Sequence, residues 1–268
     1  GFLMPLVGPR GLVLLDASTC LVTVACTMAV RQALASGASQ RAASQPGDDR
    51  DVMAGWRTIT ASSGLRALVV LMTLATLAIG VIQVLIKPIL LPTVSTAEMG
   101  VVETVAATGM LVGAALVTAW KSAQPTTLLA AGLAGTGAAM TLVPLGPGAW
   151  WVAACGFLTF ACLPLSQAGA EVLVRTQVDN TRQARTWGTI SLVTQMGYLV
   201  AYLCSGVLVD HVLQPLLEPG GSLSTSVGAV VGIGPGRGAA LLVGLMGAVM
   251  ALVALTVRLQ RRRLASPQ

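Results

Sequence analysis

Residues 171–188 read Glu-Val-Leu-Val-Arg-Thr-Gln-Val-Asp-Asn-Thr-Arg-Gln-Ala-Arg-Thr-Trp-Gly, and this stretch decides the fold. It carries three arginines, and long apolar runs flank it on both sides. A basic, polar loop between two membrane-length apolar segments has a preferred side of the membrane, the cytoplasm. We therefore expect this loop to be cytoplasmic, and that expectation sets the direction of every other segment.

The composition is that of a membrane protein. Hydrophobic residues make up 54% of the chain and charged residues only 10%, whereas about 25% of the residues of a soluble domain are charged. The net charge of +6 does not indicate a nucleic-acid partner, because aromatic residues for base stacking are few and no basic stripe lies on a soluble face. The partner that the composition predicts is the lipid bilayer.

Seven apolar runs have roughly the 20 residues that a helix needs to cross the hydrocarbon core. Membrane strands would be shorter and would alternate in polarity, so we expect an all-α membrane protein with seven transmembrane helices. The expected spans are residues 11–30, 67–91, 98–120, 126–145, 149–173, 188–209 and 238–257.

The sixteen Lys and Arg residues divide unequally between the two sides of this arrangement. With the 174–187 loop inside, thirteen are inside and three are outside, as the positive-inside rule predicts. The inner set is Arg31, Arg41, Arg50, Arg57, Arg66, Lys121, Arg175, Arg182, Arg185, Arg258, Arg261, Arg262 and Arg263; the outer set is Arg10, Lys87 and Arg237. We expect a multi-pass protein of the cell membrane with a cytoplasmic C-terminus.

The segment 31–66 is the one long inner loop. Its first part is small, polar and flexible, and two aspartates then suit a helix start. Val52, Trp56 and Ile59 follow at i, i+4 and i+7, which predicts a short amphipathic helix on the inner membrane surface. The alternative is a disordered linker.

Motifs of catalysis and of cofactor binding are not found in the sequence. There is no G-x-x-x-x-G-K-[ST], the single histidine excludes H-E-x-x-H, and the five cysteines lie in apolar runs without a C-x-x-C pair. We therefore expect no enzyme, no cofactor and no metal site. The Gly-, Ser- and Pro-rich loop 210–237, which carries His211, is expected to be mobile and without chemistry.

Four polar residues of the sixth expected span recur at i, i+4, i+7 and i+11, which places them on one helix face. They are Ser191, Gln195, Tyr198 and Tyr202. Such a stripe is poorly placed against lipid tails, and a tyrosine ring with a hydrogen-bonding tip suits an amphipathic cargo. We interpret it as one wall of a substrate cavity, with Gln83 as a further candidate. The alternative is hydrogen bonding between helices.

Lys87 and Glu103 are charged residues inside expected spans, where a charge costs about 2.5–3.5 kcal/mol at mid-span. Lys87 is near the outer end of one span and Glu103 near the outer start of the next, so antiparallel packing gives them about the same depth. One interpretation is a structural ion pair or interfacial snorkelling. In the other, Glu103 is a protonatable carboxylate coupled to transport.

Three further features concern packing and helix ends. Gly109-x-x-x-Gly113 permits close approach of two helices. Glu171 and Arg175, at i and i+4, are expected to pair at the inner membrane boundary or simply on the surface. Asp16 is interpreted as an N-cap or an interfacial acid.

The order of these features resembles the second half of a major facilitator superfamily transporter. A span that ends in basic residues precedes a long inner loop with Gly55-Trp56-Arg57 and Leu65-Arg66, and four spans, an arginine-bearing inner loop and two more spans follow. The likeness is greatest to the bacterial exporter branch of macrolide and enterobactin efflux proteins. The turn with Arg182 and Arg185 resembles the inner loop between the tenth and eleventh helices of that family.

The resemblance implies a twelve-helix transporter. Residues 1–30 would then hold the last helix of an N-terminal half that is missing here, followed by the linker 31–66, a six-helix bundle at 67–257 and a basic tail at 258–268. It implies proton-driven efflux of a small amphipathic molecule such as a drug or a siderophore, with the missing half as a partner.

The resemblance also implies a cytoplasmic gate, for which the candidates are Glu171, Arg175, Arg182 and Arg185. The alternative function is a non-transporting membrane subunit or sensor that uses the same bundle for binding. A polar stripe that faces a central cavity favours transport, whereas polar residues only at the span ends would favour the subunit.

Overall fold

The computed structural model describes residues 4–38, 53–120, 122–146, 148–179 and 182–259. Every regular element in these ranges is a helix, and seven of the helices are long and apolar enough to cross a membrane. The predicted class, an all-helical multi-pass membrane protein, is thus confirmed for the described residues. The chain divides into two compact units, Gly1–Val52 and Met53–Gln268, and each is described by itself.

The first unit contains α1 (Met4–Ala38), which includes an apolar span at Val13–Gln32. Every side chain of that span is exposed within the unit. Hydroxyl groups on α1 bond to its own backbone, as Thr23 Oγ1 does to the carbonyl of Thr19 at 2.8 Å, so they do not need another partner in lipid. The N-cap predicted for Asp16 is wrong, because α1 continues through this residue.

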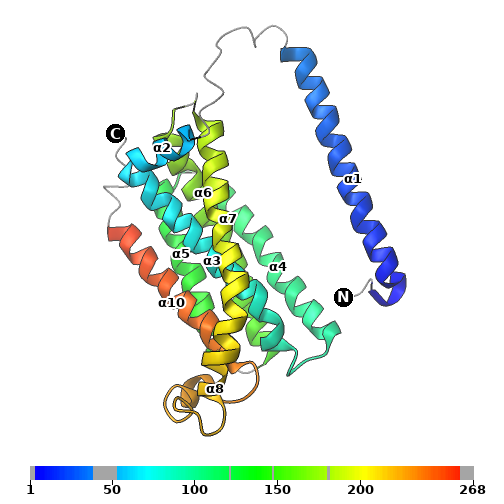
Figure 1. The fold of residues 1–268 in the computed structure, drawn as a ribbon, viewed down its shortest axis with the longest axis vertical. Helices are drawn as coiled ribbons and strands as arrows, with labels where there is room; N and C mark the ends of the chain where they lie inside the picture. Colours follow the sequence, from blue (N-terminus) through cyan, green and yellow to red (C-terminus); the bar gives the residue numbers. More distant parts are fainter. Residues whose placement is uncertain (1–3, 39–52, 121, 147, 180–181, 260–268) are drawn as a thin grey trace. The chain divides into compact units, whose positions relative to one another are not determined.

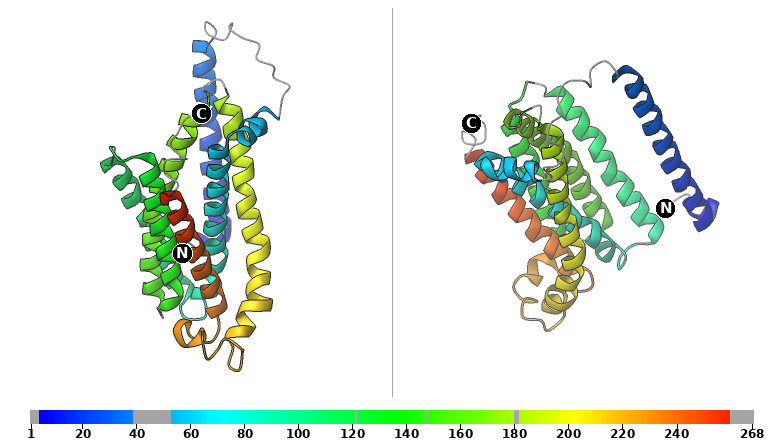
Figure 2. Two further views of the ribbon diagram at one scale, coloured as in Figure 1. Left: turned by 90° about the vertical axis from the view of Figure 1, so that its left-hand side faces the viewer. Right: turned by 45° about the horizontal axis from the view of Figure 1, so that its top comes forward.

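The second unit is a bundle of six long helices (Figure 1), which are α3 (Ser63–Leu90), α4 (Thr96–Ala119), α5 (Pro125–Leu142), α6 (Ala149–Gln177), α7 (Gln183–Leu208) and α10 (Arg237–Leu259). The short helix α2 (Ala54–Ala61) precedes them at one end of the bundle, and α8 (Gln214–Leu217) lies at the other (Figures 1 and 2). We call these ends the α2 end and the α8 end.

The stretch 171–188 is more helical than a loop between two spans. Helix α6 continues to Gln177, and α7 begins at Gln183. Helix α3 likewise begins at Ser63, before the predicted start at residue 67. Polar residues can continue a helix beyond the apolar core of a membrane, so hydropathy alone places these boundaries too close to the core.

The start of α4 has a complete capping box. The Ser95 backbone N–H donates to Glu98 Oε2 at 2.9 Å, and the Glu98 backbone N–H donates to Ser95 Oγ at 3.3 Å. This reciprocal arrangement satisfies two backbone donors that a helix start leaves unpaired. Glu98 therefore has a local structural role at the α8 end of the bundle.

Helix α6 is central to the packing, since it contacts both α4 and α5 closely, while α3 packs on α7 and α10, and α5 on α10. At the α4–α6 crossing, a Cβ on Gly109 would meet the backbone of Phe157, and one on Gly113 would meet the backbone carbonyl of Ala161. Both glycines are buried. The predicted close approach at the Gly-x-x-x-Gly motif is confirmed.

The segment expected to be the inner linker contains α2, which packs on α7. Gly55 lies against Thr189 and the backbone carbonyl of Arg185, both on α7. The Ile59 side chain is only 4% exposed, whereas that of Trp56 is 46% exposed. Val52, which was expected on the same apolar face, lies outside the described residues. Part of the face predicted to meet lipid therefore covers the bundle instead.

The segment between α7 and α10, expected to be a mobile loop, contains regular structure. Helix α7 continues into a π-helical turn at Val209–Leu213, and α8 and α9 (Gly228–Val231) follow. The Leu217 side chain is fully buried. Gln214 ties the segment together, because its Nε2 donates to the Gly234 carbonyl at 3.0 Å and its Oε1 accepts from the Gly238 N–H at 3.2 Å.

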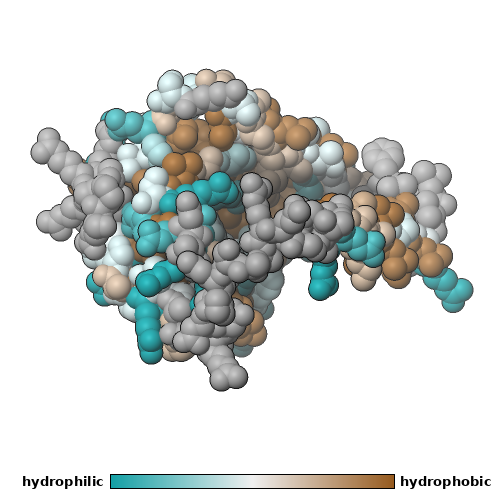
Figure 3. Space-filling model, turned by 90° about the horizontal axis from the view of Figure 1, so that it is seen from above, coloured by the Kyte–Doolittle hydropathy of each residue, from teal (hydrophilic) through white to brown (hydrophobic). Residues whose placement is uncertain are grey.

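Basic residues of the described bundle segregate by end. Those at the α2 end are Arg57, Arg66, Arg175, Arg182, Arg185 and Arg258, and those at the α8 end are Lys87 and Arg237. Figure 3, which looks onto the α2 end, shows several hydrophilic side chains there above the apolar helices. This is the distribution on which the predicted orientation depends.

Candidate functional site

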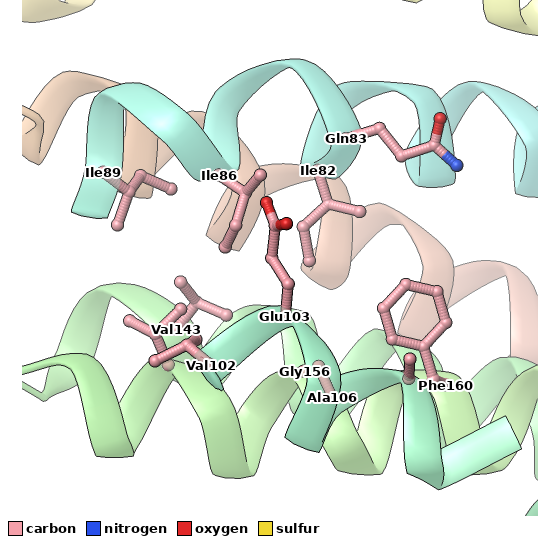
Figure 4. A pocket seen from close by; sticks show the side chains of 12 residues that line it. Ile82, Gln83, Ile86, Ile89, Val102, Glu103, Ala106, Val143, Gly156 and Phe160 are labelled. Atoms are coloured by element: carbon pink, nitrogen blue, oxygen red, sulfur yellow. The ribbon is translucent and has the colours of Figure 1, made fainter. Parts of the chain in front are cut away.

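A cavity of about 240 Å³ lies between α3, α4 and α6 (Figure 4). Its lining is almost wholly apolar and consists of Ile82, Gln83, Ile86, Ile89, Val102, Glu103, Ala106, Ala107, Val143, Val152, Gly156 and Phe160. The residues Gln83, Glu103 and Ala107 are exposed, and the rest are buried or half-buried. The cavity therefore opens to the surface on the side where its two polar residues stand.

Glu103 lies on the α4 wall, seven residues after Thr96, which is about 10 Å along the helix. Its carboxylate points toward α3 and ends near Ile82 and Ile86 (Figure 4). Within the described residues it has no hydrogen-bond or ion-pair partner. The carboxylate thus lies at the open side of the cavity, next to apolar side chains of α3.

Lys87 lies close to Glu103 in expected depth but does not reach it. It is exposed and does not line the cavity, and no ion pair joins the two residues in the described part of the chain. The preceding residue, Ile86, is on the cavity wall. One step along a helix turns the side chain by about 100°, so Lys87 points to another side of α3.

The polar stripe of α7 borders the contact between α7 and α3. The α7 residues buried against the bundle are Thr186, Ile190, Thr194, Gly197, Ala201 and Ser205. Beside them, Tyr198 is half-buried, while Ser191, Gln195 and Tyr202 are exposed. The four residues thus lie beside the face of α7 that packs on α3, and none of them is in the lining of the cavity.

One hydrogen bond joins this stripe to the cavity. Tyr202 Oη donates to Gln83 Oε1 at 2.9 Å, and Gln83 also lines the cavity. The ring centroids of Tyr198 and Tyr202 are 6.0 Å apart, with planes inclined at 41°. Tyr198, Tyr202 and Gln83 therefore form a connected group next to the cavity that contains Glu103, whereas Ser191 and Gln195 lie nearer the α2 end of α7.

A second, smaller hollow of about 100 Å³ follows the same α3–α6 seam toward the α2 end. Its polar lining comes from Thr76, Ser166, Gln167 and Thr194, and Thr76 Oγ1 donates to the Thr194 carbonyl at 2.7 Å. The pattern of apolar and polar residues in the sequence did not predict this hollow. Single threonines and serines in apolar helices usually bond to their own backbone, so the sequence contains no signal for it.

The two hollows are close together but have separate linings. On α3, Ile79 lines the smaller hollow and Ile82 the larger one; on α6, Leu163 lines the smaller and Phe160 the larger. These bulky side chains stand at the boundary between the hollows. The contact between α3 and α6 thus contains two hollows, one after the other along the helices, with apolar side chains between them.

The four gate candidates lie at the α2 end in two groups. On α6, Arg175 Nη2 is 4.0 Å from Glu171 Oε2, and both side chains are more than half exposed. At the start of α7, Arg182 and Arg185 are exposed. An exposed i,i+4 pair contributes about 0.3–0.5 kcal/mol, so the Glu171–Arg175 pair is a weak contact in this conformation.

Among the described residues, no three His, Cys, Asp or Glu side chains cluster as metal ligands. Comparison of the chain with known protein families, curated proteins and solved structures finds no match.

Proposed function

We propose that the bundle belongs to a secondary active transporter of the major facilitator superfamily, which exports a small amphipathic molecule in exchange for protons. The observation that carries this proposal is Glu103, a carboxylate without a partner among the described residues, on the wall of an apolar cavity between membrane-length helices. The resemblance of the chain to the macrolide and enterobactin exporter branch supports it.

In this proposal the tyrosine group and the cavity bind the cargo. The apolar wall of Ile82, Ile86 and Phe160 would accept the hydrophobic part of an amphipathic molecule. Tyr202 and Gln83 would bind its polar part by exchanging their mutual hydrogen bond for bonds to the cargo. The α2 end would face the cytoplasm, because most of the basic residues of the bundle are there.

Glu103 would couple the cargo to the proton. A protonated carboxyl is neutral and tolerates the apolar wall, whereas an ionised one needs water or a cationic group of the cargo. Release of the proton would thus favour cargo or water in the cavity, and uptake of a proton would favour their departure. The second half that the resemblance implies would provide the opposite wall and the alternation between the two sides.

A second candidate is a non-transporting membrane subunit or sensor. The specific observation in its favour is the Tyr202–Gln83 hydrogen bond. This bond satisfies both polar groups inside the protein without a ligand, so it is also compatible with a purely structural role.

The test is dye transport in membrane vesicles that contain the full-length protein, with ethidium as the amphipathic probe and an imposed pH gradient as the driving force. We expect Glu103→Gln to abolish gradient-driven movement, because the isosteric amide keeps the cavity shape but cannot release a proton. Ethidium binding by this variant should no longer depend on pH, because the amide never carries the negative charge that attracts the cation. Glu218→Gln, in the exposed segment before α10, is the matched control.

Two results would count against the proposal. Transport by Glu103→Gln at the wild-type rate would remove Glu103 from the coupling. Ethidium binding by the wild type without any gradient-driven movement would favour the non-transporting subunit.

A further inference from the structure

We propose that the groove between α5 and α10 binds an anionic phospholipid, with an acyl chain in the groove and the phosphate at Arg258. This groove lies apart from the cavity with Glu103 and shares none of its lining residues. The inference therefore does not depend on the proposed transport function.

The groove has a volume of about 380 Å³, and most of its lining is alanine. Its lining residues are Thr127, Ala130, Ala131, Ala134, Ala251, Ala254, Leu255 and Arg258. Ala130 and Ala254 are buried and form the floor, while Ala131, Ala134 and Leu255 are exposed and form the rim. The groove is thus an open channel on the outer surface of the bundle.

The space arises from how the two helices pack. At Gly137, α5 approaches α10 so closely that a Cβ would meet the backbone of Ala251. From this point toward the α2 end, methyl side chains stand where larger residues would fill the gap. An apolar channel between membrane-length helices is exposed to lipid tails, and a flexible acyl chain can fill it without the loss of hydrogen bonds.

The charge at one end of the groove selects the headgroup. Arg258, in the last turn of α10, is exposed and is the only charged residue of the lining. No acidic residue stands in the lining to oppose an anion. In the sequence, three further arginines follow at 261–263. Basic clusters next to the end of a membrane helix attract anionic lipids, and a guanidinium binds phosphate bidentately.

The groove has a charged end and an apolar length, as a phospholipid has a charged headgroup and an apolar chain. The apolar lining extends from Arg258 along α5 and α10 away from the α2 end, as an acyl chain extends from its headgroup toward the membrane centre. A soluble anion would pair with Arg258 but would leave the apolar channel unfilled. An apolar helix of another protein would fill the channel but would bring no negative charge to pair with Arg258.

The experiment measures lipid retained by the purified full-length chain in detergent, after exchange into micelles with either phosphatidylglycerol or phosphatidylcholine, by quantitative mass spectrometry. We expect Arg258→Gln to lower phosphatidylglycerol affinity about fivefold, the effect of one basic residue near an anionic surface, and to leave phosphatidylcholine unchanged. The matched control is Arg66→Gln, an exposed arginine at the same end of the bundle, which should retain wild-type affinity.

A second pair of variants tests the channel itself. Ala134→Phe should fill the rim of the groove and reduce retention of both lipids, whereas Ala114→Phe, on the exposed face of α4, should not. Helical content by circular dichroism checks that each variant folds. Equal losses from Arg258→Gln and Arg66→Gln would overturn the site. So would a change of oligomeric state with unaltered lipid retention in Ala134→Phe, which would make the groove a contact between copies of the chain.

Discussion

The phenol of Tyr202 donates a hydrogen bond to Gln83 Oε1 across 2.9 Å, although the two residues are 119 positions apart in the chain. The bond joins α7 to α3 beside the cavity that Glu103 lines. It joins the side chains of two different long helices of the described bundle. We therefore expect this hydrogen bond to stabilise the packing of α7 on α3 at the proposed cargo site.

Tyr202→Phe should lower the free energy of unfolding in a bilayer mimic by about 0.6 kcal/mol, the mean for hydrogen bonds between membrane helices. Gln83→Leu should have little further effect in the Tyr202→Phe background, because its partner is already gone. Tyr198→Phe is the control, since the Tyr198 hydroxyl makes no hydrogen bond within the described residues. An equal decrease in the free energy of unfolding from Tyr198→Phe would show that the effect of Tyr202→Phe does not come from the Tyr202–Gln83 hydrogen bond.

Lys87→Met and Glu103→Gln should have additive effects on stability, within about 0.5 kcal/mol, because no ion pair joins the two residues. The measurement is a double-mutant cycle on the free energy of unfolding. A double variant that is more stable than either single variant would contradict this expectation, since removal of one partner of a pair leaves an uncompensated charge. That outcome would restore the ion pair that the sequence allowed.

Gly109→Ala and Gly113→Ala should destabilise the bundle by about 1–3 kcal/mol, because each added methyl group would meet the α6 backbone. The control is Gly206→Ala in α7, where a Cβ meets nothing within 4 Å. This control should be neutral or more stable by up to about 1 kcal/mol, since alanine favours helix over glycine. Thermal unfolding of the purified protein measures all three variants, and the same sign of change in all of them would refute close packing at the motif.

The orientation of the bundle can be tested with two reporter fusions. A reporter placed after Arg263 should be active only as a cytoplasmic fusion, and one inserted at Ser222, in the segment between α8 and α9, should be active only as an external one. The reason is that the basic residues gather at the α2 end. Fluorescent protein and phosphatase fusions report the two sides in opposite ways. Signals that place both sites on the same side of the membrane would exclude this topology.

The residues around the cavity could be predicted from the sequence one helix at a time, but not their arrangement between helices. The one-face spacing of Tyr198 and Tyr202 on α7 was visible in the sequence, and so was an acid at Glu103. Their arrangement around Gln83 was not, because it depends on the rotation and offset of α3 against α7 and α4. The same rotation turns Lys87 away from Glu103, so equal depth in the membrane did not make the two residues partners.

The sequence by itself determined that this is a multi-pass helical protein and which ends of its helices carry the basic residues. Both properties depend on local composition, since a run of about 20 apolar residues can satisfy its backbone in lipid only as a helix. The tertiary structure decided which faces of these helices meet. It buried Ile59 against the bundle, left space beside Glu103, and opened the alanine groove that ends at Arg258. Contacts between residues far apart in the chain depend on helix rotation and small-residue packing, which local hydropathy does not encode.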